Sequence, residues 1–227
     1  MRSIFFLWLL LGSTVLRAES WTEALARMPL PTGTTHLSRT NCAEILLSAF
    51  HSNTVVKTLI FMPGATDELY FFRRAQASLI SPNSTLLDAV VALTNQTHIR
   101  ATLHPPFLLL HSDEDVLDVP VTIEHAGAME KLRQGKPLPP LMFLDKDWDA
   151  VRKKVKGHIK PILWPGPYSN DSRHFYRHTF AAWNLSPWET LEAIAFAAKA
   201  RITVRRSSVV FTPDERFGTL PKLEKFP

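Results

Sequence analysis

The sequence predicts an α+β fold in which helices pack on short mixed or antiparallel sheets. Helical patterns, with apolar residues three and four apart, alternate with short runs of β-branched and apolar residues. The order strand, helix, strand, strand occurs around residues 70–111 and again around 175–211. Since 17 prolines stand against only 8 glycines, we expect stiff connections between these elements. The chain is therefore expected to contain two related strand–helix–hairpin units.

The N-terminus is typical of a secretory signal peptide over residues 1–18. Arg2 supplies the positive charge, Ile4–Leu11 forms the apolar region, and Ala18 is the expected last residue before cleavage. The apolar run is far shorter than the roughly 20 residues that span a bilayer, and no later segment is long and apolar enough. We therefore expect a secreted or periplasmic protein without a transmembrane segment after signal removal.

Residues 19–54 are expected to be helical and irregular, with a short helix over Trp21–Met28. Thr40–Glu44 is expected to cap a second short helix that runs through Phe50. The first α+β unit, residues 55–135, opens with the apolar strand Val55–Met62. Its further expected elements are the helix Leu86–Gln96, the strands Ile99–Leu103, Phe107–His111 and Val119–Ile123, and the helix Ala126–Arg133.

The second unit, residues 136–213, opens with the strand Leu141–Leu144, and Asp145 is the expected N-cap of a helix over Lys146–His158. Residues 214–227 are polar and are expected to form a flexible tail. The other expected elements are a strand at Lys160–Trp164, a strand or helix start at Phe175–Trp183, a helix at Trp188–Ala200, and a hairpin of Ile202–Arg206 with Ser208–Phe211.

A short motif lies at the start of the expected helix in each strand–helix–hairpin unit. Residues 81–90, SPNSTLLDAV, are echoed by residues 186–194, SPWETLEAI. We expect Ser to cap each helix and Pro to occupy its first position, which is where proline is favoured. The repeat predicts a duplicated supersecondary unit and does not name a reaction.

The second copy, residues 185–211, resembles the short module at the N-termini of secretins and TonB-dependent receptors. The similarity lies in the helix Leu185–Ala195, followed by Ala198–Val204 and the strand Val209–Phe211. Residues 86–110 are similar, so the resemblance covers about 35 residues per copy. It implies a binding module exposed to the cell envelope rather than a catalyst.

Composition excludes several function classes. Cleavage after Ala18 leaves 24 basic against 21 acidic residues, a net charge of about +3, which does not indicate a nucleic-acid partner. The densest basic run, Arg152–Lys160, is expected to be a solvated helix face. The single cysteine, Cys42, permits no internal disulfide and is expected to be a buried apolar side chain. Neither a Gly-rich phosphate loop nor a Gly-x-Ser-x-Gly elbow is present, and no cofactor is expected.

The loop Pro63–Glu68 is the best single candidate for a catalytic site. It follows a strong strand and carries Thr66, Asp67 and Glu68. The two acids are candidates for general acid and base catalysis, and His111 is a further candidate. The simpler interpretation is that Thr66 or Asp67 caps a helix that begins at Glu68.

His174 and His178 lie four residues apart, a spacing that puts both on one face of a helix and permits metal ligation. The Glu of zinc proteases is missing because Phe175 follows His174. Surface or packing histidines are therefore the expected interpretation, with a metal site as the alternative. The acidic turn Asp113–Asp118 lacks the glycine of a calcium loop and is expected to be solvated.

Aromatic residues gather between residues 148 and 188. If exposed, Trp164, Tyr168, Trp183 and Trp188 are candidates for stacking on a bound ligand; otherwise they form part of the core.

Four asparagines head Asn-x-Ser/Thr patterns, which matter if the host glycosylates exported proteins. They are Asn83, Asn95, Asn170 and Asn184, and Pro187 after the last pattern argues against its use.

We expect an exported, non-catalytic binding or envelope-assembly protein whose partner is a protein or a cell-envelope component. This hypothesis predicts an exposed apolar patch or an open strand edge. The alternative is an exported hydrolase with its site at the Pro63–Glu68 loop. That alternative predicts that Asp67, His111 and either His174 or His178 converge within about 6 Å in one cleft.

Overall fold

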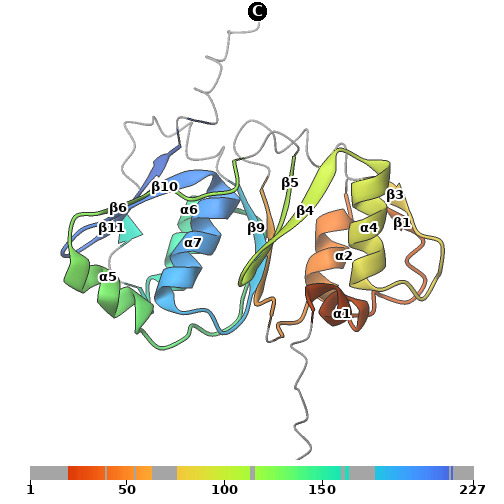
Figure 1. Ribbon diagram of the computed structural model, residues 1–227, viewed down its shortest axis with the longest axis horizontal. Coiled ribbons are helices and arrows are strands. Elements are labelled where there is room, and N and C mark those ends of the chain that lie inside the picture. Colours follow the sequence, from red (N-terminus) through yellow and green to blue (C-terminus); the bar gives the residue numbers. More distant parts are fainter. Residues whose placement is uncertain are drawn as a thin grey trace, which may run out of the picture.

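The computed structural model describes residues 20–38, 40–53, 55–62, 76–112, 116–159, 162–163, 177–214 and 216. Helices pack on mixed and antiparallel sheets, which confirms the predicted α+β class (Figure 1). The described helices are α1 (Trp21–Ala26), α2 (Cys42–Ala49), α4 (Leu86–Gln96), α5 (Ala126–Arg133), α6 (Trp148–Val155) and α7 (Pro187–Ala198). The described strands are β1 (His36–Leu37), β2 (Thr58–Phe61), β3 (Ala77–Ser78), β4 (Ile99–His104), β5 (Phe107–Ser112), β6 (Val121–Ile123), β7 (Leu141–Asp147), β8 (Ile162–Leu163), β9 (Arg177–Ala182), β10 (Ala200–Val204) and β11 (Val209–Pro213).

A five-stranded sheet of order β4-β5-β2-β9-β7 forms the centre of the molecule. Strand β2 pairs in parallel with β5 and antiparallel with β9. Its side chains alternate between two cores, since Leu59 and Phe61 belong to one and Ile60 and Met62 to the other. A strand that is covered on both faces has a continuous apolar run in its sequence, and this is the pattern that predicts β2.

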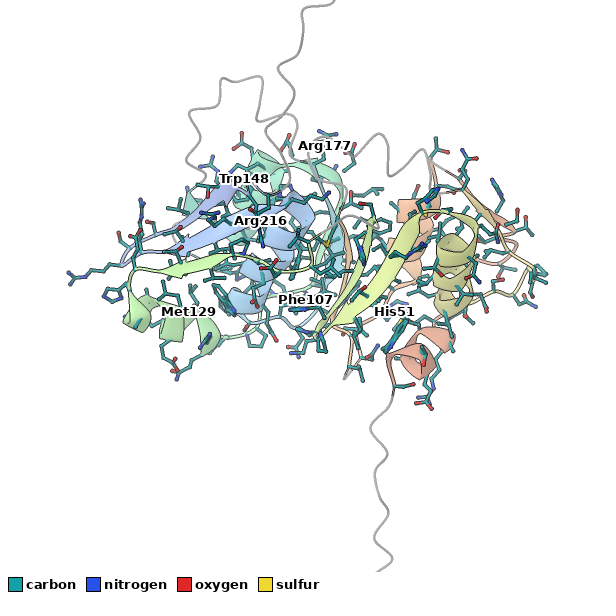
Figure 2. All side chains as sticks on the ribbon, turned by 45° about the horizontal axis from the view of Figure 1, so that its top comes forward. His51, Phe107, Met129, Trp148, Arg177 and Arg216 are labelled. Atoms are coloured by element: carbon teal, nitrogen blue, oxygen red, sulfur yellow. The ribbon has the colours of Figure 1, made fainter. Side chains whose placement is uncertain are left out.

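Helices cover both faces of the central sheet (Figure 1). On one face, α1, α2 and α4 build a core that includes the buried Cys42. On the other face, α6 and α7 lie between the central sheet and a second sheet of order β6-β10-β11-β8. Met129 on α5 lies on this second side, far from His51 on the first (Figure 2).

Both sheets take strands from each of the two predicted units. The central sheet combines β2, β4 and β5 of residues 55–135 with β7 and β9 of residues 136–213. In the second sheet, β6 of the first unit pairs in parallel with β10 of the second. The segments 55–135 and 136–213 thus share their cores rather than lying side by side.

Each of the two predicted units contains a helix followed by an antiparallel hairpin, α4-β4-β5 and α7-β10-β11. The expected helix start is wrong in the first unit. Thr85 caps α4, because its hydroxyl accepts from the Asp88 backbone N–H while the Asp88 carboxylate accepts from the Thr85 N–H. Ser81 instead accepts from the Asn83 N–H in the preceding turn. Ser186 does cap α7, so the Ser-Pro pairs of the two motifs occupy different positions relative to their helices.

The expected cap of the following helix also needs correction. Asp145 is not an N-cap, because β7 continues past an irregularity between Phe143 and Lys146 and ends at Asp147. The Asp147 carboxylate accepts from the Ala150 N–H at 2.8 Å and starts α6, which ends at Val155. Asp145 has a φ of 50°, and both its oxygens accept hydrogen bonds from Arg177, each at 2.7 Å.

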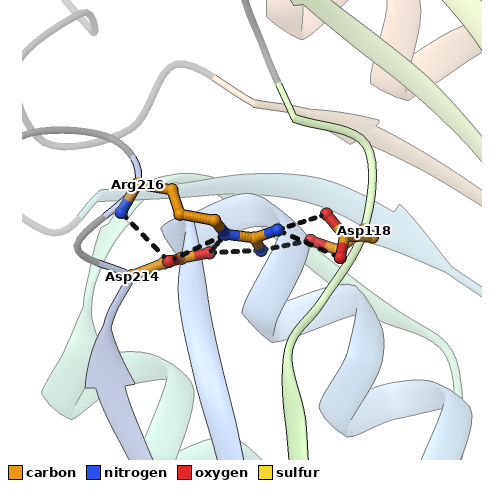
Figure 3. Close-up of polar contacts among 3 residues, drawn as sticks. All are labelled: Asp118, Asp214 and Arg216. Atoms are coloured by element: carbon orange, nitrogen blue, oxygen red, sulfur yellow. Dashed lines mark hydrogen bonds and ion pairs between the residues drawn. The ribbon is translucent and has the colours of Figure 1, made fainter.

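The first residues of the predicted tail, residues 214–227, are held against the body (Figure 3). The Asp214 side chain is fully buried and pairs with the Arg216 guanidinium. Arg216 also donates to Asp118, which precedes β6, at 2.8 Å. Burial raises the pKa of Asp214, but the hydrogen bonds from Arg216 outweigh it and leave this pKa below its usual value. The clasp of Asp118, Asp214 and Arg216 therefore ties the end of β11 to the segment before β6.

Two outer strands expose apolar side chains. Met142 on β7 is 53 % exposed, and Ile123 on β6 is 49 % exposed. Each strand lies at the end of its sheet. Exposed apolar side chains therefore lie on a terminal strand of each of these two sheets. Within the described residues, no helix has the length and apolarity to cross a membrane.

Candidate functional site

The whole predicted catalytic loop, residues 63–68 with Thr66, Asp67 and Glu68, lies outside the described part of the chain. The binding candidates Trp164 and Tyr168 and the metal candidate His174 also lie outside it. The convergence of Asp67 with the histidines therefore stays a prediction. The described candidates are His111, His178, Trp183 and Trp188.

His111 is a buried, hydrogen-bonded histidine of β5. Its Nδ1 lies 2.7 Å from the Ser112 carbonyl oxygen, and its Nε2 lies 2.9 Å from the Thr102 hydroxyl. A carbonyl oxygen only accepts, so Nδ1 carries the proton and Nε2 of the neutral ring accepts from Thr102. Both ring nitrogens are thus engaged in structural hydrogen bonds.

His178 lies on β9, is buried, and packs with its ring centroid 5.9 Å from that of Trp148. The pairing registers place Met62 between His111 and His178 in one row of the central sheet. The backbones of His111 and His178 are therefore two strand spacings, or about 10 Å, apart. In the described residues no three His, Cys, Asp or Glu side chains group closely enough to hold a metal ion.

The two described tryptophan candidates pack against protein. Trp188 is 8 % exposed and belongs to the core beside α7. The Trp183 ring is half-buried, with its centroid 5.2 Å from that of Phe50 and 6.5 Å from that of His51. Cys42 is also buried, and burial raises the pKa of its thiol to about 12, which confirms the apolar interpretation.

A cleft of about 910 Å³ lies at the end of the molecule that carries α5 (Figure 1). Four segments form its walls: α5, residues 135–139, residues 157–159 after α6, and the β10–β11 turn. We call it the cationic cleft because six basic or imidazole side chains line it: His125, Lys131, Lys136, His158, Arg205 and Arg206.

No acidic side chain is among the described residues that line the cationic cleft. Glu124 approaches from outside, where one of its carboxylate oxygens accepts from Arg205 Nε at 3.1 Å. A hollow lined by charge of one sign concentrates the electrostatic potential and attracts ions of the other sign. The described lining therefore favours an anion over a cation.

Helix α5 is a polar wall that carries little of the core. Met129 is its buried residue, and Lys131 lies in its last turn. His125 caps the helix, since its Nδ1 accepts from the Ala128 N–H at 3.0 Å. The neutral ring then carries its proton on Nε2.

The wall formed by residues 135–139 depends on a glycine. A Cβ on Gly135 would lie 2.4 Å from Cγ of Pro187, the first residue of α7. Real Cβ atoms do not approach other heavy atoms so closely. Only glycine therefore lets residues 135–139 pass over the start of α7.

The opposite wall is the turn between β10 and β11. It is closed by a hydrogen bond of 2.8 Å from the Arg205 N–H to the Ser208 carbonyl. This turn places Arg205, Arg206, Ser207 and Ser208 together on the cleft.

Glu192 on α7 is the described carboxyl with the most raised pKa, although it does not line the cleft. Burial raises the pKa of Glu192 to about 7, and the charge of Glu189 adds to the rise. A hydrogen bond from Trp188 and the charge of Arg133 on α5 oppose it.

Sequence reasoning did not find the cationic cleft. Its charges come from segments that are remote in the chain, and the adjacent pair Arg205–Arg206 was the one local signal. The denser run on α6 is exposed, as expected of a solvated helix face. Comparison with protein-family models, curated proteins and solved structures finds no match to this chain.

Proposed function

We propose that this chain is an exported, non-catalytic binding protein that holds an anionic cell-envelope component in the cationic cleft. One observation carries the proposal. Lys131, Lys136, Arg205 and Arg206 surround one hollow of about 910 Å³ whose described lining contains no acidic side chain.

The chemistry of the lining favours phosphate or sulfate groups. Arginine offers a planar fork of donors that matches such oxyanions, and lysine adds a mobile point charge. Ser207 and Ser208 bring hydroxyl groups to the same wall as Arg205 and Arg206. The volume also lies within the range of about 300–1,000 Å³ that is usual for ligand sites.

The lining favours binding over catalysis. A histidine that acts as a general base is commonly held by a carboxylate, and none lines the described cleft. The imidazole of His125 is already used at Nδ1 to cap α5. The imidazole of His158, next to the exposed end of α6, has no hydrogen-bond partner within the described residues.

The signal-peptide pattern of residues 1–18 supports export. Expression of the full chain with its own N-terminus in a secreting host should give a mature protein that begins at Glu19. Intact-mass measurement of the exported protein tests this expectation. Retention of Met1 on a protein that stays inside the cell would contradict the export part of the proposal.

The binding part is tested with the purified full chain and two probes, inorganic triphosphate and a sulfated oligosaccharide, by titration calorimetry. The variant Lys131→Ala/Arg206→Ala removes one cation from each wall. We expect it to weaken binding about tenfold, or about 1.4 kcal/mol. Binding should also weaken as salt is added, because the screening length falls below about 10 Å above 0.1 M salt.

The matched control is Lys153→Ala/Lys154→Ala, which removes the same charge from exposed positions on α6 outside the cleft. It should change the affinity less than twofold. Equal losses in the two double variants would show that net charge rather than the cleft binds the probe. Absence of binding of both probes to the parent chain at low salt would refute the proposal.

A further inference from the structure

The asparagines of this chain are strongly biased toward one sequence pattern. The chain has six asparagines, and four of them head Asn-x-Ser/Thr. Serine and threonine together make up 34 of the 227 residues, so chance would give such a pattern to about one asparagine in seven. This pattern is the acceptor of N-linked glycans in exported proteins.

The two asparagines outside the pattern have structural roles. The side-chain oxygen of Asn41 accepts from the Ser38 N–H at 2.7 Å, before α2. The side-chain oxygen of Asn53 accepts from the N–H groups of Val55 and Val56 at 2.8 and 2.7 Å. Both side chains hold turns, which explains why asparagine stands there.

The patterned asparagines are different. Asn83 lies in the turn before α4, and Asn95 lies near the end of that helix. Both are exposed, and neither side chain has a hydrogen-bond partner among the described residues. Asn184 is exposed as well, but the Pro187 that follows its pattern disfavours its use. Asn170 lies outside the described residues.

Asn83 and Asn95 flank an apolar patch that is otherwise unexplained. Ile80 is fully exposed and Val91 is 45 % exposed. Both line a shallow hollow of about 220 Å³, and Asn95 lines the same hollow. Asn83 lies between Ser81 and Ser84, which also border it.

We propose that Asn83 and Asn95 each carry an N-linked glycan and that the two glycans cover the Ile80–Val91 patch. Entry into a glycosylating secretory pathway rests on the proposed export. The exposed positions of Asn83 and Asn95 leave room for a glycan in the folded protein. Sugar chains on both sides of the patch shield apolar side chains that water contacts unfavourably.

The reaction takes its sugar from a polyprenyl-diphosphate-linked oligosaccharide. The bond between the anomeric carbon and the diphosphate oxygen breaks, and the polyprenyl diphosphate leaves with the electron pair. The Asn Nδ2 forms the new bond to the anomeric carbon and loses one proton. No oxidation or reduction takes place.

The glycan sites lie away from the cationic cleft. Asn83 lies before α4 and Asn95 lies in its last turn, whereas α5 and the β10–β11 turn, which line the cleft, lie at the other end of the molecule (Figure 1). Glycosylation at Asn83 and Asn95 therefore leaves the cleft open.

The test expresses the full chain in a eukaryotic secretory cell line, once with its own N-terminus and once with a foreign signal peptide in place of residues 1–18. Peptide N-glycosidase treatment in heavy-oxygen water converts each glycosylated Asn to a labelled Asp, which peptide mass spectrometry locates. We expect the label at Asn83 and Asn95. Asn83→Gln and Asn95→Gln should each remove one glycan, and Asn184→Gln should remove none.

The two forms separate the two proposals. Suppose that the form with the foreign signal peptide is labelled at Asn83 and Asn95 but the form with its own N-terminus is not secreted. The proposed export is then refuted, and the proposed glycan sites are supported. If both asparagines are unlabelled in protein secreted with the foreign signal, the acceptor sites are refuted.

Coverage of the patch is tested by the fluorescence of a dye that binds apolar surface. Removal of the glycans from the folded protein should increase it severalfold, and Ile80→Ser should abolish most of the increase. As a matched control, Ile123→Ser on β6 should lower the signal equally with and without glycans, because Ile123 is exposed at another edge. No increase on glycan removal would overturn the shielding.

Discussion

Replacement of Gly135 by alanine tests the close approach between residues 135–139 and the start of α7. The added Cβ would meet Pro187 Cγ at 2.4 Å and Cδ at 2.9 Å, and the Lys131 carbonyl oxygen at 3.3 Å. Carbon atoms in contact prefer about 3.5–4.0 Å, so the overlap with the ring exceeds about 1 Å. The pyrrolidine ring cannot rotate away, because it is the first residue of the buried helix α7.

The expected loss of stability follows from two opposing effects. Overpacking of this kind costs about 1–3 kcal/mol. Gly→Ala also reduces the freedom of the unfolded chain, which stabilises the protein by about 0.4–1 kcal/mol. We therefore expect Gly135→Ala to lower the free energy of unfolding by about 1–2 kcal/mol. For a chain of this size, the melting temperature should fall by about 2–8 °C.

Gly157→Ala is the matched control. A Cβ on Gly157 meets nothing within 4 Å, and its φ is not in the left-handed region. The entropic effect acts alone there, so this variant should be about 0.4–1 kcal/mol more stable than the parent. Urea unfolding followed by circular dichroism measures both changes. A Gly135→Ala variant as stable as the parent, beside a stabilised Gly157→Ala, would refute the argument from close packing.

Three further predictions concern buried ionisable groups. At pH 8, Cys42 should react with a disulfide reagent roughly a thousandfold more slowly in the folded than in the unfolded protein, because burial raises the pKa of its thiol to about 12. Equal reaction rates in the presence and absence of urea would contradict this prediction. Arg216→Ala should cost about 2–3 kcal/mol at pH 7, because it removes the guanidinium that pairs with the buried Asp214 carboxylate and leaves only the backbone N–H of residue 216. Arg205→Ala, at an exposed pair, should cost less than about 1 kcal/mol. Because the pKa of Asp214 is lowered in the folded protein, its contribution to stability is present above the unfolded pKa near 4 and is lost as pH falls through the folded value. The urea midpoints of the parent and of Arg216→Ala should therefore converge in acid. The raised pKa of Glu192 has the opposite effect on the pH dependence of stability. The contribution of Glu192 to stability is fully present below about pH 4.5 and is lost as pH rises through about 7. Glu192→Gln should therefore have the same urea midpoint as the parent at pH 4.5 and a higher one at pH 8.

Local sequence signals predicted the helices and hairpins well where residues near the two ends of an element define its bounds. The helices Leu86–Gln96 and Ala126–Arg133 have the predicted bounds, since apolar spacing and neighbouring side chains define them. The hairpins around Pro105–Pro106 and Ser207 also formed as expected. Asp145 misled the prediction, because an irregularity in the pairing of β7 with the distant β9 extends the strand past it.

The sequence by itself determined the α+β class, the burial of Cys42 and the order of helices and hairpins, because these depend on residues that are neighbours in the chain or on simple apolar patterns. Tertiary structure alone decided which strands share a sheet and which side chains meet. The cationic cleft joins Lys131 with Arg206, and the clasp joins Asp118 with Arg216, across long stretches of chain. No local pattern encodes such pairs, because their distance depends on how two sheets and the helices between them pack.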